Sequence, residues 1–310
     1  MFIRTVALIG LLAAAAGCGV GSEATVEEGV DAVSVVEEDL GTTSQSYVRV
    51  RVDPRRCMAP MCGGYWVSDV NRVTLSERYV SHLDFSVSGL SEDDADRVRS
   101  APAGELLLRG RLGAPDATYS TRAFLVTEAY RGMPGVVPAA GEAFYRAGPR
   151  TPQINCFAAP CDNEVATKLN YTAKTNFTGY QVDRAAVPFA DKTWLIGRIA
   201  AHGALVSGKF VSGQLFPGGR EKLLSASQVF LRIPDRVGPC PMPPIYLCSA
   251  GKEQTYNHTA DRCDLPAQCA APGTCSSFVP ICAQDYSRYS WRQGDSACFA
   301  HACYPAFTSP

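Results

Sequence analysis

The stretch Tyr47–Asn71, "YVRVRVDPRRCMAPMCGGYWVSDVN", carries the pattern that decides the fold. After Tyr47 valine alternates with arginine, which is the period of two expected for a half-buried β-strand. A second candidate strand, "GYWVSDVN", begins at Gly64, directly after the two cysteines of "CMAPMC". The stretch therefore predicts two strands of a β-rich body, separated by a loop that carries a pair of cysteines.

The same six-residue device occurs a second time, about a hundred residues later. At a nearly constant offset of 99 or 100 residues, short motifs recur in the same order: CMAPMC (57–62) and CFAAPC (156–161), VN (70–71) and LN (169–170), VTEAYR (126–131) and ASQVFL (226–231). Such an offset indicates two copies of one structural unit, at residues 47–136 and 137–234. Chance similarity of β-rich segments is the alternative explanation.

Further strands are predicted in both units from short apolar runs and alternating patterns. They are the segments 79–87, 105–112 and 121–130 in the first unit, and 164–172, 193–203, 204–213 and 222–233 in the second. The second unit has a short helix or none, because Pro188 interrupts the segment that would form it. We therefore expect an α+β fold, mostly antiparallel β, with an internally duplicated body.

One helix is expected in the first unit, within "LSEDDADRVRS" (90–100). Ser91 is a suitable N-cap, and the carboxylates of Glu92, Asp93 and Asp94 favour the positive end of the helix dipole. A calcium site is the alternative for these carboxylates. An EF-hand loop, however, spreads its ligands over twelve residues with a glycine at the sixth, and this segment lacks that pattern.

The chain has thirteen cysteines, and one of them, Cys18, lies in the leader described below. The other twelve form an even set, which predicts six disulfides in an exported protein: Cys57, Cys62, Cys156, Cys161, Cys240, Cys248, Cys263, Cys269, Cys275, Cys282, Cys298 and Cys303. Zinc bound by the two "C-x₄-C" pairs is the alternative, but that spacing lies at the edge of the range for zinc knuckles. We expect no metal and no cofactor.

Eight of these cysteines fall in residues 240–310, and they repeat as two four-cysteine modules. Modules of this size cannot assemble a hydrophobic core of their own, so we expect disulfides to stabilise a small C-terminal region, residues 235–310. Four cysteines allow three pairings in each module, and all three stay open at this point.

The N-terminus predicts export. The apolar run Val6–Ala16 is too short to span a bilayer, but it fits a secretory signal at residues 1–17. The small residues before Cys18 resemble the lipobox of bacterial lipoproteins, in which the cysteine is acylated after cleavage, although Ala15 stands where leucine is usual. An ordinary signal cleaved within "AAAAG" is the alternative.

The segment 18–46 is acidic, lacks basic and aromatic residues, and is expected to be a flexible tether.

Two resemblances extend this reading. "CMAPMCGGYWVSDVN", "CFAAPC" and the signal with its cysteine resemble an uncharacterised family of predicted bacterial surface lipoproteins that share a domain of unknown function, here at about residues 47–233. Relatives carry an extra cysteine pair around the segment equivalent to Thr74–Val80, which this chain lacks. The C-terminal modules are distantly similar to antistasin or Kazal inhibitor domains, although their spacings match neither.

No catalytic motif accompanies these features. The sequence has no nucleophile elbow, zinc-protease helix or phosphate-binding loop, and we expect no enzymatic activity. His82 and Asp84 fall on one face of a predicted strand, and they are the pair to test if the chain is a hydrolase.

The predicted function is that of a binding or structural lipoprotein held to the cell envelope, with an unknown protein partner and no nucleic acid, because no basic helix or basic-aromatic platform is present. Gly19, rather than aspartate, after the acylated cysteine favours the outer membrane. The alternative function is protease inhibition, in which Lys252, Arg288 or Arg292 on a long loop between cysteines would enter a trypsin-like pocket.

Overall fold

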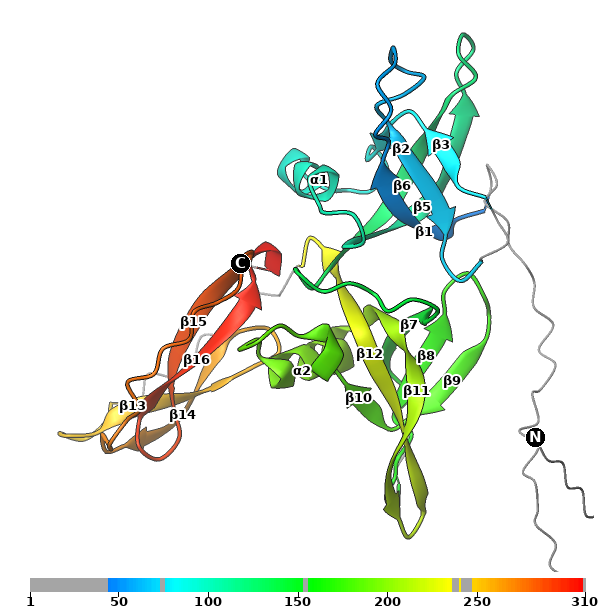
Figure 1. Cartoon of the computed structure of the whole chain (residues 1–310). Coiled ribbons are helices and arrows are strands. Elements are labelled where there is room, and N and C mark those ends of the chain that lie inside the picture. Colours follow the sequence, from blue (N-terminus) through cyan, green and yellow to red (C-terminus); the bar gives the residue numbers. More distant parts are fainter. Residues whose placement is uncertain (1–43, 73–75, 153–155, 236–239, 241–246, 309–310) are drawn as a thin grey trace, which may run out of the picture. The chain divides into compact units, whose positions relative to one another are not determined.

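The computed structural model describes residues 44–72, 76–152, 156–235, 240 and 247–308. Within these ranges the chain forms a 12-stranded, mostly antiparallel sheet, two α-helices and two C-terminal hairpins (Figure 1). The predicted α+β class, mostly antiparallel β, is confirmed, as is a disulfide-rich C-terminal region. Cys18, the predicted signal and most of the predicted tether lie outside the described residues.

The first half of the sheet is built from the residues up to Gly132. Its strands pair in the order β3-β2-β1-β5-β6, and β4 pairs with β6 in parallel. Its elements are β1 (Ser46–Val52), β2 (Tyr65–Asp69), β3 (Arg78–Val80), β4 (Leu83–Asp84), α1 (Glu92–Arg99), β5 (Leu106–Pro115) and β6 (Arg122–Gly132). Ser91 caps α1 as predicted, because its side chain accepts a hydrogen bond from the backbone N–H of Asp94.

The second half repeats this order. Its strands pair as β9-β8-β7-β11-β12, and β10 pairs with β12 in parallel. Its elements are β7 (Ala143–Pro149), β8 (Glu164–Lys168), β9 (Lys174–Phe177), β10 (Gly179–Gln181), η1 (Asp183–Ala185), α2 (Lys192–His202), β11 (Ala204–Phe216) and β12 (Gly219–Ile233). The last strands of the halves, β6 and β12, pair antiparallel, with Phe230 opposite Gly132.

Irregularities in the strands also repeat. The β5–β6 register shifts between Arg109 and Gly110, and the β11–β12 register shifts between Ser207 and Gly208. A Cβ added at either glycine would overlap a backbone oxygen of the neighbouring strand. Only glycine therefore fits these two bulges.

Two asparagines join the halves reciprocally. Asn71 donates from Nδ2 to the carbonyl of Phe144 (2.8 Å), and its Oδ1 accepts from the N–H of Phe144 (2.8 Å). Asn170 makes the equivalent pair of bonds with the N–H (2.7 Å) and carbonyl (2.8 Å) of Tyr47. Both asparagines have positive φ, 63° and 62°, a conformation that asparagine tolerates better than most residues. Each half therefore satisfies backbone groups in the first strand of the other.

One sequence-based prediction was wrong. Residues 193–203 were expected to form a strand and the second unit was expected to have a short helix or none, but Lys192–His202 forms the longer of the two described α-helices. Asp191 caps it by accepting from the N–H of Trp194 (2.8 Å), so Pro188 lies before the helix and does not interrupt it. The buried side chains, Trp194, Leu195, Arg198 and Ile199, are spaced as one helical face.

The C-terminal modules are two hairpins with the same bridges. The strands are β13 (Glu253–His258), β14 (Asp264–Ala270), β15 (Tyr286–Gln293) and β16 (Cys298–Pro305), followed by η2 (Ala306–Thr308). Each module joins its first cysteine to its third and its second to its fourth: Cys240–Cys263, Cys248–Cys269, Cys275–Cys298 and Cys282–Cys303. The body has two further bridges, Cys57–Cys62 and Cys156–Cys161.

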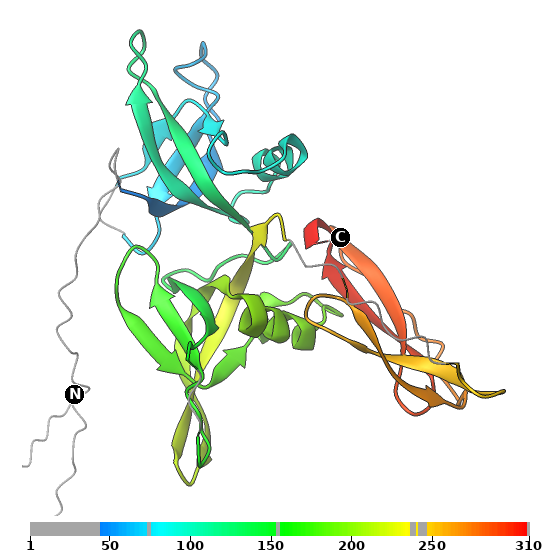
Figure 2. The same cartoon turned by 180° about the vertical axis from the view of Figure 1, so that it is seen from behind.

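Helix α2 packs against these hairpins and so joins their core to that of the second half. The hydrophobic core of the second half continues into the C-terminal region, where Trp194 packs edge-on against Tyr304 with ring centroids 5.0 Å apart. The Trp194 indole N–H also donates to the carbonyl of Ala260 (2.9 Å). The first half has a core of its own, to which α1 contributes Val98. The view from behind shows α2 between the strands of the second half and the hairpins (Figure 2).

Candidate functional site

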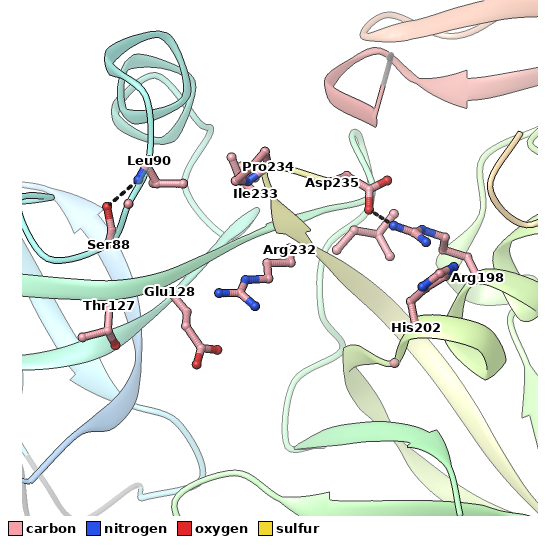
Figure 3. Close-up of a pocket in the computed structure, with 13 residues that line it drawn as sticks. Ser88, Leu90, Thr127, Glu128, Arg198, His202, Arg232, Ile233, Pro234 and Asp235 are labelled. Atoms are coloured by element: carbon pink, nitrogen blue, oxygen red, sulfur yellow. Dashed lines mark hydrogen bonds and ion pairs between the residues drawn. The ribbon is translucent and has the colours of Figure 1, made fainter. Parts of the chain in front are cut away.

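A polar cavity of about 480 Å³ lies where β6, the end of β12 and the C-terminal end of α2 meet (Figure 3). Backbone and side chains from four segments line it: Ser88–Leu90, Thr127 and Glu128, Arg198 with His202 and Gly203, and Leu231–Asp235. Strand pairing between the two halves positions the β6 and β12 residues, and the length of α2 brings Arg198 and His202 to the same place.

Arg198 is the buried charge of the site. Its side chain is only 5% exposed, and it pairs with Asp235 and, at 3.2 Å, with Asp261. A buried guanidinium requires such partners, because its removal from water is costly. Its Nε, however, has no hydrogen-bond partner. One buried donor of Arg198 is therefore unsatisfied.

Arg232 supplies a second cation. It lies near the end of β12, is exposed, and extends its guanidinium into the cavity (Figure 3). Within the part of the chain that the structure describes, this guanidinium makes no hydrogen bond or ion pair. Its charge is therefore available to a ligand.

The carboxylates of the cavity are already paired. Glu128 accepts from Arg109 (2.7 Å), Arg146 (3.3 Å) and Tyr130. Burial raises the pKa of Glu128, but the hydrogen bonds from Tyr130 and Arg109 outweigh it, and the net pKa lies below the usual value. Glu128 is therefore an ionised carboxylate whose charge is compensated by its own neighbours.

His202 completes the wall at the end of α2. Its Nε2 lies 2.5 Å from Oδ1 of Asp261, the carboxylate that also contacts Arg198. With Asp235 and Asp261 both engaged, the groups left without a partner are the Arg232 guanidinium and Nε of Arg198. This arrangement can bind an anionic group, such as a carboxylate or a phosphate, by charge-assisted hydrogen bonds.

The sequence did not single out these residues. The signal available was a lone arginine, Arg198, inside the apolar run "TWLIGRIAAH", at a spacing that places it on the buried face of a helix. Such a residue needs a buried acid, and Asp235 in "RIPDR" is the first one after β12. A strand over residues 193–203, as expected from the sequence, does not predict the pairing of Arg198 with Asp235.

His82 and Asp84 both line a cavity of about 540 Å³ beside α1, but they are not joined as a catalytic pair. Nδ1 of His82 contacts the hydroxyl of Ser81 (3.1 Å), while Asp84 accepts from the N–H of Ser86 (2.8 Å). This backbone hydrogen bond holds the pKa of Asp84 below its usual range. No hydrogen bond joins His82 to Asp84 in the described contacts.

Two of the three residues predicted for protease binding lie on a strand and not on a loop, which corrects that part of the expectation. Arg288 and Arg292 belong to strand β15, and Lys252 immediately precedes β13. Arg292 is held by an ion pair with Glu253 and stacks over Phe299, 4.5 Å from the ring centroid. Lys252 and Arg288 are exposed.

The comparisons with known proteins give a family without a known activity. Residues 46–236 match the model described as "Domain of unknown function (DUF6748)". An uncharacterized protein of Dictyostelium discoideum is 26% identical over 272 residues, covering 85% of this chain and 88% of that protein. This match is longer than the domain, so the likeness extends beyond residues 46–236. No solved structure matches.

No helix in the described ranges is long and apolar enough to cross a bilayer.

The family match covers both halves of the sheet, from the start of β1 to Asp235, and thus includes the cavity residues contributed by β6, α2 and β12. The chain belongs to the DUF6748 family, a family defined by a domain of unknown function.

Proposed function

We propose that the protein is an exported, lipid-anchored binding protein of the cell envelope, without catalytic activity, that binds an anionic group of its ligand in the Arg232 cavity. The observation that carries the binding site is the Arg232 guanidinium, which extends into the cavity and makes no hydrogen bond or ion pair among the described residues. Every carboxylate among the lining residues already has a cationic partner, so an added anion meets an excess of positive charge.

Export and anchoring are supported by the leader and the disulfides. Six bridges persist in an oxidising compartment, and they are rare in the reducing cytosol. The signal-like run ending before Cys18 supplies a route of export, and acylation of Cys18 would fix the chain to the membrane, with the outer membrane as the proposed destination.

The body, in this proposal, arose by duplication of one unit, giving units 47–136 and 137–234 followed by the C-terminal region 235–310. The support is the shared order of strands, the equivalent bulges at Gly110 and Gly208, and the reciprocal bonds of Asn71 and Asn170. Unrelated β-hairpins would not be expected to share all three features.

A binding role rather than catalysis is supported by where the histidines lie. The contact between Ser290 and His301 (2.7 Å) and the contact between His258 and Asp264 (2.8 Å) use different histidines. A serine triad needs one histidine that contacts both the hydroxyl and the acid. The described residues supply the two contacts separately.

The binding proposal is tested by titrating the purified chain with inorganic phosphate, acetate and uncharged acetamide, following the arginine side-chain signals by NMR. The Arg232 signal should shift saturably with the two anions and not with acetamide. Arg232→Gln should abolish the response, whereas Arg288→Gln, a change at an exposed arginine on β15, should retain it. A response to no anion, or one that survives Arg232→Gln, would refute the site.

The anchor has its own test. Mass spectrometry of the chain from membranes of its host should find diacylglycerol and an amide-linked acyl group on an N-terminal Cys18. An unmodified N-terminus produced by cleavage at another position would refute the anchor and leave the cavity proposal standing.

A further inference from the structure

A second, larger cavity of about 910 Å³ lies between the N-terminal end of α2 and the C-terminal hairpins. Its volume falls within the range of small-molecule sites in proteins. None of its lining residues belongs to the Arg232 cavity, and its walls differ in chemistry.

The charged groups of this second cavity are fully engaged. Asp191 accepts from the N–H of Trp194 (2.8 Å) and from the hydroxyl of Tyr304 (2.9 Å). Lys192 pairs with Asp183 (2.6 Å). An anionic ligand would therefore find no unpaired lysine or arginine among the described lining residues, in contrast to the Arg232 cavity, and both oxygens of Asp191 already accept hydrogen bonds.

A buried imidazole presents an unused hydrogen-bonding atom. The side chain of His258 is only 4% exposed, and its Nδ1 lies 2.8 Å from Oδ1 of Asp264. This contact occupies Nδ1, and Nε2 is the ring nitrogen left to form a further hydrogen bond. Nε2 has no partner in the structure. A ligand hydroxyl would satisfy it.

Two free amides and several aromatic rings complete the wall. Asn257 and Gln293 are exposed, and among the described contacts their side chains make no hydrogen bond. Each amide offers both donors and an acceptor. Tyr256 and Phe189 line the same cavity and leave part of their ring surface accessible. The cavity thus combines neutral hydrogen-bonding groups with apolar ring faces.

We infer that this cavity binds a neutral, hydroxyl-rich ligand, namely the sugar rings of an uncharged oligosaccharide. Sugar hydroxyls both donate and accept, which matches the amides of Asn257 and Gln293 and the unpartnered Nε2 of His258. The C–H faces of a sugar ring are apolar and pack against aromatic side chains. This inference does not depend on the Arg232 site.

The test is calorimetric titration of the full chain with chitotriose, cellotriose, maltotriose and mannotriose, alongside trigalacturonate and chitosan trimer as charged probes. At least one neutral trisaccharide should bind saturably, and the charged probes should bind more weakly. Asn257→Ala with Gln293→Ala should weaken that binding by about tenfold, as expected for the loss of two hydrogen bonds.

Asn176→Ala with Gln214→Ala is the matched control, since it removes an exposed asparagine and an exposed glutamine outside the cavity and should leave the affinity unchanged. Arg232→Gln should also leave it unchanged, which separates this proposal from the anion site. Failure of all four neutral probes, tighter binding of a charged probe, or full affinity in the Asn257 and Gln293 variant would each overturn the inference.

Discussion

Helices α1 and α2 occupy the same place in the order of elements of the two halves, but they differ in what they bury. Helix α1 has eight residues, and Ala95 and Val98 are its buried apolar side chains. Helix α2 has eleven residues and buries Trp194, Leu195 and Ile199, together with the charged Arg198. The first-half helix covers its own core, whereas the second-half helix also contacts the C-terminal hairpins.

This difference shows how two halves with the same strand order can use their helices differently. Strand order, bulges and the reciprocal asparagines are common to both halves. Both cavities described above take residues from α2, and neither takes a residue from α1. The extra length and the larger side chains of α2 are therefore what separate the second half from the first.

The largest expected effect comes from Trp194→Ala. Loss of this buried ring should lower the free energy of unfolding by about 3–5 kcal/mol, against about 2 kcal/mol for Val98→Ala in α1. Hydrogen exchange should show β16 amides losing protection in Trp194→Ala only, because Trp194 packs on Tyr304. Unchanged protection of β16 in Trp194→Ala would contradict the role of α2 as a support for the hairpins.

Removal of disulfides should also affect the regions unequally. Cys282 and Cys303 are 21 residues apart, whereas Cys57 and Cys62 are 5 apart. Replacing the first pair with alanine should cost about 3 kcal/mol and the second about 2 kcal/mol, because a longer closed loop restricts the unfolded chain more. Denaturant unfolding measures both. A larger loss from the Cys57 and Cys62 pair would rule out loop length as the main factor.

Substitution of Asn71 or Asn170 tests whether the reciprocal hydrogen bonds of the two halves contribute equally to stability. Asn71→Gly and Asn170→Gly preserve the positive φ but remove the acceptors of the Phe144 and Tyr47 N–H groups, whereas the two carbonyls keep their bonds from the N–H groups of Leu169 and Val70. Each should therefore lower the free energy of unfolding by about 2 kcal/mol. Urea titration of the two variants compares them directly. Unequal losses would show that the two contacts, although alike in geometry, differ in energy.

The smallest effect is a pH dependence confined to the first half. Hydrogen bonds from Arg55, aided by Trp66, lower the pKa of Asp53 from 3.8 to about 2. The unfolded chain therefore takes up this proton first, and the contribution of Asp53 to stability is lost as the pH falls from about 4 to about 2. The equivalent segment of the second half has Gly148 in place of this acid, in the alignment of "DPRRC" with "GPRTPQINC".

In unfolding experiments across this pH range, the difference in stability between the natural chain and Asp53→Asn should shrink as the pH falls. Asp93→Asn is a control, because it changes an exposed aspartate in the same half that makes no hydrogen bond or ion pair among the described residues. A constant difference across the range would exclude Asp53 as the titrating group.

Much of the fold is readable from local patterns. The alternation in "YVRVRV" predicts β1, and the cap at Ser91 predicts α1. The bridge pattern of the C-terminal modules also had a signal in the sequence. Joining the first cysteine to the third and the second to the fourth is the pairing that gives both modules identical separations, 23 and 21 residues.

Helix α2 was mispredicted because an apolar run of eleven residues fits either a buried strand or a helix. Pro188 does not exclude this helix, because the helix begins after Asp191. Packing favours the helix, because Trp194, Leu195 and Ile199 lie on one face of a helix and can all enter the core together.

The sequence by itself determined the alternating pattern of β1, the even set of twelve cysteines and the repeated order of motifs, because each depends on neighbouring residues or on a fixed spacing along the chain. Only the tertiary structure decided which charges are paired. Arg198 meets Asp235 and Asp261 from different segments, while Arg232 makes no ion pair with any described residue. Whether a charge is neutralised depends on distances across the fold, and those distances are not encoded in any local spacing.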